Sequence, residues 1–462
     1  MASPAAFSVR ERSQVSPATG SLLETTLPLT FFDVMWLNRD PVERLFFYRF
    51  PDPTCNFMQA VVPALKSSLS VALQSFYPFA GRIRRCPGCC DKYEIHYVDG
   101  DSVSFALAEH GGDFEYLSRS HAHNVSELLP LIPRIAESGD DRLSLAVQVT
   151  LFPDRGVAVA VTFHHAVCDG TGFKQLIASW ASACRSAMSG QEVAVPPKPL
   201  FDKTVITDPR GLYTVFSNMG PRRRVAEEDS ATDVVSATFT LRREQIRSLK
   251  DLVPAKAEQG KTPFHCSTVV VAFAFAWVCH VRARGHGSDR ITHFIFMADC
   301  RRRLRPSVPA EYFGNCGRPC FVDVKAEDLI RRDGFVVASA AIGRVIEELK
   351  ADVLHDAEEW RGGAQAAMAE QALTVAGSPK FGVYDADMGW GRPNKVEVTS
   401  IRTSGAILVG ESREDEGGVE IGLVLPRNEM EEFGAQFLGG LKLVICCDGA
   451  VRSINSYLYI YC

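Results

Sequence analysis

The sequence predicts an α/β fold with mixed β-sheets flanked by helices, divided into two domains. Segments with strand-like alternation and segments with helical i, i+3, i+4 spacing occur in both halves of the chain. A length of 462 residues exceeds one ordinary core and suits two domains of about 200 residues each. Because the stretch 195–203 is rich in proline, we expect a crossover over 196–215 between domains over 1–195 and 216–462.

The first elements of the N-terminal half are a strand and a helix. Residues 41–50 have the composition of a strand, and apolar side chains follow at helical spacing from Leu65 to Phe76. The helix should stop at Tyr77-Pro78, where a proline cannot continue it. Asp99-Gly100, between two alternating segments, predicts a hairpin.

A strand over residues 157–165 ends in the residue around which we organise the functional prediction. Its apolar side chains share one face with His165, and the turn 153–156 pairs this strand with the alternating segment 143–151. The resulting register sends the neighbouring His164 to the opposite face. A histidine at a strand end is more often a packed structural group, but a neutral imidazole can also serve as a general base near pH 7.

Asp169-Gly170 then turns the chain into a helix with Thr171 near its cap. Asp169 could orient His165 as in a catalytic triad, or it could be turned away and paired elsewhere, as a buried carboxylate must be. His164, His165 and Asp169 also have the residue types of a metal site, but adjacent strand residues point to opposite faces, so we expect no metal.

The C-terminal half repeats the mixture of strands and helices. Ser267-Thr268 opens an apolar helix, which it can cap or whose free amides it can present to an anion. The predicted strands are 235–241, 291–297, 396–402, 406–409 and 419–425, and the predicted helices are 242–252, 267–281, 335–350 and 428–443.

Composition excludes several classes of protein. With 46% hydrophobic and 23% charged residues and no apolar run long enough to cross a membrane, the chain has the profile of a soluble globular protein. We expect it in the cytoplasm with its 14 cysteines reduced, and the Cys86–Cys90 cluster as a Pro-Gly hairpin rather than a zinc knuckle, because Cys446-Cys447 is a poor second pair. A net charge of −5 argues against nucleic-acid binding.

Two other enzyme classes lack their motifs. The chain contains no G-x-S-x-G nucleophile elbow, which disfavours a serine hydrolase. Gly170-Thr171-Gly172 lacks the third glycine of a dinucleotide-binding turn.

Several motifs together resemble those of the plant BAHD acyltransferases, which move acyl groups from coenzyme A thioesters to hydroxyl or amine acceptors. His165–Gly170 matches H-x-x-x-D-G, Asp387–Gly391 matches D-F-G-W-G with Met388 in place of Phe, and Tyr77–Arg82 is similar to Y-P-x-A-G-R. Tyr312–Cys316 and Gly377–Phe381 are similar to segments of the branch that malonylates anthocyanin, flavonoid or phenolic glucosides.

The resemblance implies two domains of similar architecture with an active-site channel at their interface and His165 at its middle. A thioester is already activated, so direct transfer in a ternary complex needs a base, His165, and a donor to the oxyanion. Trp390 is implied to lie near the tetrahedral intermediate, although a Trp packed at a domain interface is an equal alternative. Asp169 is implied to pair with Arg301. Structural support is further implied for the motif residues Asp387, Gly389 and Gly391.

Candidate substrate-binding residues come from the same motifs and from charge. They are Gly170, Thr171, Lys174, Ser267, Tyr312 and Asn315. A malonyl carboxylate needs a nearby cation, for which Lys174 is a candidate, although an exposed helix lysine is the commoner explanation. Arg301–Arg303, Arg305, Lys256 and Lys261 could face the phosphates of coenzyme A, although charge runs are usually solvated.

The resulting functional hypothesis is transfer from malonyl-CoA, as a co-substrate and not a bound cofactor, to a sugar hydroxyl of a flavonoid, anthocyanin or phenolic glucoside. We expect a monomer whose partners are these small molecules, without nucleic acid or membrane. One alternative is a hydroxycinnamoyl-CoA donor on the same fold, and a more distant one is a non-catalytic small-molecule binding protein. The departures from the family pattern are Met388, Gly317-Arg318 and the apolar tail Tyr457–Cys462.

Overall fold

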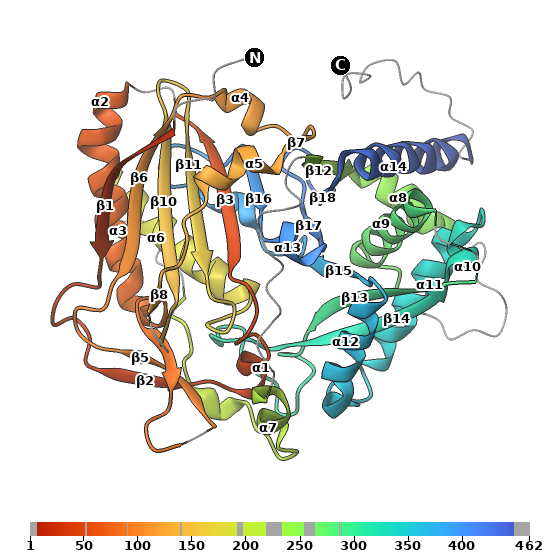
Figure 1. Ribbon diagram of the computed structural model, residues 1–462, viewed down its shortest axis with the longest axis horizontal. Coiled ribbons are helices and arrows are strands. Elements are labelled where there is room, and N and C mark those ends of the chain that lie inside the picture. Colours follow the sequence, from red (N-terminus) through yellow and green to blue (C-terminus); the bar gives the residue numbers. More distant parts are fainter. Residues whose placement is uncertain are drawn as a thin grey trace.

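The computed structural model is mixed α/β, which confirms the predicted fold class (Figure 1). It describes residues 7–50, 53–89, 91–138, 141–191, 197–218, 233–253, 264–285, 287 and 289–447. Several predicted features lie outside these residues: Cys90, Lys256, Lys261, the start of the crossover and the tail Tyr457–Cys462. Within the described part of the chain, no helix is both long enough and apolar enough to cross a membrane.

The first sheet has six strands and carries the candidate histidine. Their order is β1 (Phe7–Val15), β6 (Val103–His110), β10 (Leu145–Phe152), β11 (Gly156–Phe163), β3 (Val42–Arg49) and β16 (Lys395–Val398). β10 and β11 form the predicted hairpin, with Leu145 opposite Phe163, and every residue in both strands is buried. This register fixes which side chain follows Phe163 onto each face.

The alternation of side chains in β3 and β11 divides the packing between two layers. Phe46, Tyr48 and the odd-numbered apolar residues of β11 pack with helices α3 (Val62–Ser75) and α6 (Gly170–Ser189). Leu45, Phe47 and Ala160 face a smaller cluster that includes helices α4 (Phe114–Leu117) and α5 (Val125–Leu128). His165 continues the odd-numbered side, so it emerges on the same face as α6.

The second sheet has seven strands. Their order is β14 (Gly317–Lys325), β13 (Ile291–Asp299), β15 (Leu373–Ala376), β17 (Ile407–Glu411), β18 (Val419–Pro426), β12 (Val234–Leu241) and β7 (His123–Asn124). Helices gather on the side of this sheet away from the first sheet (Figure 1): α8 (Arg243–Leu252), α9 (Thr268–Arg284), α10 (Ala326–Ile330), α11 (Gly334–Glu348) and α14 (Arg427–Cys447). α9 is buried along most of its length, as its uniformly apolar sequence predicts.

The two large sheets exchange strands. β16, from the C-terminal half, pairs with β3 of the first sheet, and β7, from the N-terminal half, pairs with β12 of the second. The side chain of Glu43 in β3 also accepts hydrogen bonds from Thr399 and Arg402. The chain therefore ties its halves together by backbone pairing as well as side-chain contact. The domain boundaries at 195 and 216 stay a prediction.

A small third sheet lies below the first in Figure 1. Its strands are β2 (Thr25–Pro28), β5 (Tyr93–Tyr97), β4 (Arg82–Arg85), β9 (Asp141–Leu143) and β8 (Glu137–Ser138). Two short helices, α1 (Phe31–Val34) and α7 (Leu212–Ser217), pack together beside it. The remaining short helices are α2 (Thr54–Asn56), α12 (Trp360–Ala369) and α13 (Ile401–Ser404).

The structure departs from the sequence prediction in three details. Asp99-Gly100 does not close a hairpin, because β5 pairs with β2 and β4 whereas β6 pairs with β1 and β10. The predicted strand 396–402 ends at Val398 and continues into α13. β1 was not predicted, because an edge strand needs few apolar residues. The Cys86–Cys89 turn does join β4 to β5 as a hairpin, as predicted.

Gly156 gives a test of the packing that positions β11. A Cβ on Gly156 would lie 2.3 Å from the ring of Phe114, which is buried and has little room to move. We expect Gly156→Ala to lower the free energy of unfolding by about 1–3 kcal/mol in denaturant titrations. Gly362→Ala, exposed in α12 with open space at its Cβ, is the matched control and should be neutral or slightly stabilising. Unchanged stability of Gly156→Ala would contradict this packing.

Candidate active site

His165 lies two residues beyond β11 and is partly exposed. Its imidazole stacks face to face on Trp36, with ring centroids 3.7 Å apart and an interplanar angle of 10°. Burial lowers the pKa of His165 below its ordinary value, and the positive charge of Arg44 acts in the same direction. The histidine is therefore held rigid and neutral at pH 7.

The tautomer of His165 follows from the hydrogen bonds of Asn315. The Asn315 amide nitrogen Nδ2 donates to the Asp33 carboxylate at 3.0 Å and to the backbone carbonyl of His165 at 2.9 Å. Both partners can only accept, so the amide oxygen of Asn315 is the atom that faces His165 Nδ1 at 3.1 Å. Nδ1 must then carry the hydrogen, which leaves the lone pair of Nε2 free to accept a proton.

The carboxylate behind Asn315 is fully buried and joins three distant segments. Asp33, in α1, accepts hydrogen bonds from the backbone and amide nitrogens of Asn315 through Oδ1. Its Oδ2 accepts from Lys203 Nζ at 3.0 Å and from both the hydroxyl and the backbone N–H of Thr30. Lys203 belongs to the predicted crossover. The charge of Asp33 is thus balanced by a lysine that is itself only 8% exposed.

Asp169 is turned away from His165 and toward Arg301. Its Oδ1 caps α6 by accepting from the N–H groups of Thr171 and Gly172, and its Oδ2 lies 2.8 Å from Arg301 Nη1. Arg301 is buried and also donates to the carbonyls of Tyr312 and Gly314. Burial lowers the pKa of Arg301, but the charge and hydrogen bond of Asp169 more than offset it, so the net pKa is raised. This is the pairing that the resemblance implied.

Tyr312 is buried beneath the side chains of Lys203 and Arg301. It has no exposed surface, and the cations of Lys203 and Arg301 lie over its ring at 5.1 and 5.8 Å. Gly314, with a φ of +146°, leaves room beside Tyr312 for Lys203, whose Nζ would lie 2.3 Å from a Cβ at this position. The tyrosine of the segment Tyr312–Cys316 therefore supports the network, and its asparagine contacts the candidate base.

Trp390 does not lie beside His165, contrary to what the resemblance implied. Its ring packs edge-on against Tyr48 and Phe50, about six residues, or roughly 20 Å, along β3 from the end near His165. Its loop is also held at the far end of α6, where Arg185 donates to the carbonyl of Asp387. The structure therefore agrees with the alternative, a tryptophan of the second half that packs against a strand of the first half.

Asp387, Gly389 and Gly391 form the support of that loop. The Asp387 carboxylate accepts from the backbone N–H groups of Gly389 and Gly391 at 2.8 and 2.9 Å. Both glycines have positive φ angles, 113° and 101°, which favour a residue without a Cβ. Met388 is buried in the first core cluster, so this departure from the motif is accommodated by packing.

The remaining candidates for substrate binding lie at the start of α6 and at the start of α9. Gly170 allows the ring of Phe381 to pack on the turn, since a Cβ there would lie 2.5 Å from it. Lys174 is exposed, but it lines a cavity next to Gly382. Ser267 caps α9 by accepting from Val270 N–H, far along the chain from the His165 turn, and no hydrogen bond in the described residues links it to His165. Thr171 contributes its N–H to the Asp169 cap.

The arginines of the cluster 301–305 have different hydrogen-bond partners. Arg301 pairs with Asp169, while Arg303 and Arg305 donate to backbone carbonyls of their own turn.

His164 accepts from the Ala166 N–H through Nδ1, and burial, followed by the charges of Arg142 and His165, lowers its pKa to about 3. In the described part of the chain, no group of three or more His, Cys, Asp or Glu side chains is arranged to hold a metal ion.

Four residues of the site were missed from sequence: Trp36, Asp33, Lys203 and Arg44. A single carboxylate inside the apolar run 31–37 was the one available signal for Asp33, since a buried charge needs a partner. Lys203 follows a Pro-rich stretch that reads as exposed. Nothing local marks Trp36 or Arg44.

The fold joins two α/β halves that exchange strands, and its candidate site holds a neutral imidazole with a free Nε2. Comparisons identify the family. Residues 6–438 match the sequence profile of the Transferase family. Phenolic glucoside malonyltransferase 1 of Arabidopsis thaliana is 35% identical over 447 residues, covering 91% of this chain and 94% of that protein. The chain belongs to the BAHD acyltransferase family, and it is an acyl-CoA-dependent acyltransferase.

Other relatives differ in their donors. A malonyl-coenzyme A:anthocyanin 3-O-glucoside-6''-O-malonyltransferase of Dahlia pinnata is 34% identical and covers 95% of this chain and 98% of its own length. A coumaroyl-CoA:anthocyanidin 3-O-glucoside-6''-O-coumaroyltransferase 2 of Arabidopsis thaliana is 35% identical, with 94% and 98% covered. The crystal structure of vinorine synthase shares the fold, with a TM-score of 0.71 at 22% identity over 94% of this chain and 98% of that one.

Asp169→Asn separates a structural from a catalytic role. Among the described residues, the substitution leaves the buried Arg301 with only the exposed Asp299 as a charged partner, so we expect a loss of up to about 3–5 kcal/mol of stability, with activity falling in parallel. Asp299→Asn is the matched control and should change stability by about 0–1 kcal/mol. A variant Asp169→Asn that unfolds like the wild type but has lost activity would contradict the structural role.

The lowered pKa of His165 predicts the pH dependence of activity. A base must be neutral, and burial lowers the pKa of His165, so kcat/KM should stay high as pH falls to about 6.5 and decline only below it. Folding stability should follow the same direction. A histidine whose folded pKa is depressed favours the folded state above its unfolded pKa and loses this contribution as pH falls. An acid limb of kcat/KM at or above pH 6.5 would rule out this environment for the base.

Proposed function

We propose that this enzyme transfers a malonyl group from malonyl-CoA to a sugar hydroxyl of a flavonoid, anthocyanin or phenolic glucoside, with His165 as general base. The observation that carries the proposal is the free Nε2 of His165, fixed by the Asn315 amide. The names of the similar proteins support the donor and the acceptor class.

The reaction needs one proton carrier and no enzyme nucleophile. Nε2 of His165 takes the hydroxyl proton while the acceptor oxygen attacks the thioester carbonyl, and the tetrahedral intermediate collapses as the carbon–sulfur bond breaks. The imidazolium then returns its proton to the thiolate of coenzyme A, which leaves an ester and free coenzyme A. The stacked Trp36 ring keeps the imidazole plane fixed through both proton transfers.

Lys174 is our proposed reader of the malonyl carboxylate. It follows the His165–Asp169 turn by one helical turn and lines a cavity with Gly170, Phe173 and Arg44. A p-coumaroyl donor is the second candidate, because coumaroyltransferases are as similar to this chain as malonyltransferases are. In that case Lys174 would be a solvated helix residue.

We further propose that the enzyme works as a monomer in the cytoplasm and holds no permanently bound cofactor. Ten cysteines within the described residues are free thiols, which supports a reducing compartment.

Transfer assays test the proposal. Wild type and His165→Ala are incubated with malonyl-CoA or p-coumaroyl-CoA and a panel of flavonoid and phenolic glucosides, and free thiol and product mass are followed. We expect a malonylated glucoside from the wild type and a rate about 10²–10⁴-fold lower from His165→Ala. His355→Ala, an exposed histidine, is the control and should match the wild type. Wild-type rates without His165 would refute the base.

The donor is tested in the same assay with Lys174→Met. Loss of a charged contact should raise the KM for malonyl-CoA about 10-fold and leave that for p-coumaroyl-CoA unchanged. Turnover by the wild type with p-coumaroyl-CoA alone would keep the mechanism and reject the malonyl donor.

A further inference from the structure

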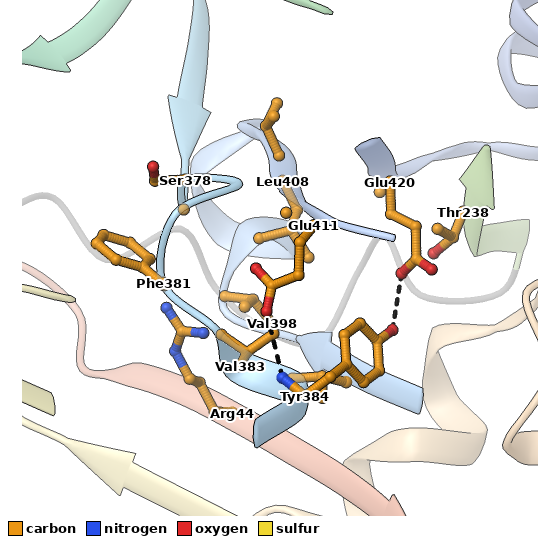
Figure 2. A pocket seen from close by; sticks show the side chains of 15 residues that line it. Arg44, Thr238, Ser378, Phe381, Val383, Tyr384, Val398, Leu408, Glu411 and Glu420 are labelled. Carbon is orange, nitrogen blue, oxygen red and sulfur yellow. Dashed lines mark hydrogen bonds between the residues drawn. The ribbon is translucent and has the colours of Figure 1, made fainter. Parts of the chain in front are cut away.

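A pocket opens between the two large sheets (Figure 2). Its walls come from β3 and β16 of the first sheet, β12, β17 and β18 of the second, and the loop 377–384. Apolar side chains form much of the lining: Phe381, Val383, Val396, Val398, Leu408 and Val409. Three charged side chains, Arg44, Glu411 and Glu420, interrupt this apolar surface. The Glu420 carboxylate accepts from the Tyr384 hydroxyl and the Arg413 N–H, so Arg44 and Glu411 are the two with fewer partners.

Arg44 is buried and largely uncommitted. It is 6% exposed, and its Nε has no hydrogen-bond partner among the described residues. Its guanidinium lies 5.3 Å from the centroid of the Phe173 ring. Burial lowers the pKa of Arg44 to about 10, so the side chain keeps its charge at neutral pH.

Glu411 offers the complementary atom from the opposite wall. One carboxylate oxygen, Oε1, accepts from the backbone N–H of Tyr384 at 3.2 Å. The other, Oε2, is buried and has no hydrogen-bond partner in the described residues. Figure 2 shows Glu411 and Arg44 pointing toward one another across the cavity, and no ion pair within 4.0 Å joins these two described side chains. A donor and an acceptor therefore face the same space unpaired.

The chemistry of this space selects its occupant. A carboxylate ligand would be attracted by Arg44 but repelled by Glu411 and Glu420, and an ammonium group would be attracted by these carboxylates but repelled by Arg44. A hydroxyl group can accept from the guanidinium and donate to the carboxylate at once. Several hydroxyls on one ring would satisfy both walls, while the apolar lining would cover the faces of the ring. The chemistry of the lining therefore suits a neutral polyhydroxyl ring, such as a sugar.

A neighbouring pocket extends toward the turn that follows the candidate base. This second pocket shares Arg44, Phe381 and Val383 with the first and extends to Gly170, which follows the His165–Asp169 turn. Arg44 is close enough to His165 for its charge to lower the pKa of the imidazole. A ring held between Arg44 and Glu411 would thus lie on the side of Arg44 that adjoins the His165–Asp169 turn.

We propose that Arg44 and Glu411 form the binding site for the sugar of the acceptor glucoside. Arg44 donates to sugar oxygens, and Glu411 accepts from a sugar hydroxyl. The inference rests on the proposed transfer to a glucoside, because it assigns that acceptor's sugar to named residues. It makes both residues determinants of acceptor affinity and not of donor choice.

Two variants test the site from opposite walls. Arg44→Met removes the donor at similar length. Glu411→Gln turns an amide N–H₂ toward the cavity, because the Tyr384 N–H retains the amide oxygen as its acceptor. The exposed Glu414→Gln is the matched control for the second substitution. Thermal unfolding is recorded for each, and Glu411→Gln, at a half-buried residue, keeps the test open if Arg44→Met does not fold.

Acceptor affinity is measured in two ways: KM for a phenolic glucoside with malonyl-CoA and with p-coumaroyl-CoA, and calorimetric binding of the glucoside without any donor. Both variants should raise the KM for the glucoside at least about 10-fold, whichever donor is used, and weaken its binding by a similar factor. The KM values for the two donors should stay unchanged. Binding of the aglycone without sugar should not change, and Glu414→Gln should match the wild type.

Three outcomes would separate the possibilities. If Arg44→Met raises KM for malonyl-CoA alone, Arg44 reads the donor carboxylate and the sugar site is wrong. If neither variant changes glucoside binding, water alone bridges the pair and the sugar site is again wrong. If the wild type binds the glucoside, both variants lose this binding and no transfer occurs, the sugar site stands and the proposed function fails.

Discussion

The buried carboxylate of Asp33 is the interaction on which the site depends. It accepts five hydrogen bonds from three segments: Thr30 beside it, Lys203 in the predicted crossover and Asn315 in the second half of the chain. A charge with no exposed surface is tolerated only when it is paired and fully hydrogen-bonded, so these segments are fixed relative to one another. The orientation of the Asn315 amide follows from this arrangement, and the tautomer of His165 follows from the amide.

The carboxylates of the family motifs hold the chain together, whereas other residues contact His165. Asp169 and Arg301 join the turn after His165 to the second half, and Asp387 holds a glycine loop at the far end of α6. Neither carboxylate hydrogen-bonds the imidazole. The residues that do act on His165 are Trp36, which stacks on it, and Asn315, which orients it. Spacing in the sequence thus points to His165, the proposed base, but misplaces part of its surroundings.

What the sequence could predict was local. Alternation placed the β10–β11 hairpin and the face of His165, and helical spacing placed α6, because these patterns repeat within a few residues. The contacts of Asp33 span 170 and 282 residues, and no local pattern encodes such pairings. Arg44 read as an ordinary strand charge, because its burial arises only when β16 and the 377–384 loop close over it. The exchange of β7 and β16 between the sheets was hidden for the same reason.

The protonation state of the His165 ring tests the central claim most directly. Protein labelled with ¹⁵N in its histidines, with the His165 signals identified by their absence from His165→Ala, would show each ring nitrogen separately at pH 7. The network predicts a protonated Nδ1 and an unprotonated Nε2, and a mixture of tautomers once Asn315→Ala removes the acceptor. A protonated Nε2 in the wild type would contradict the account, because the nitrogen assigned to take the acceptor's proton would already carry one.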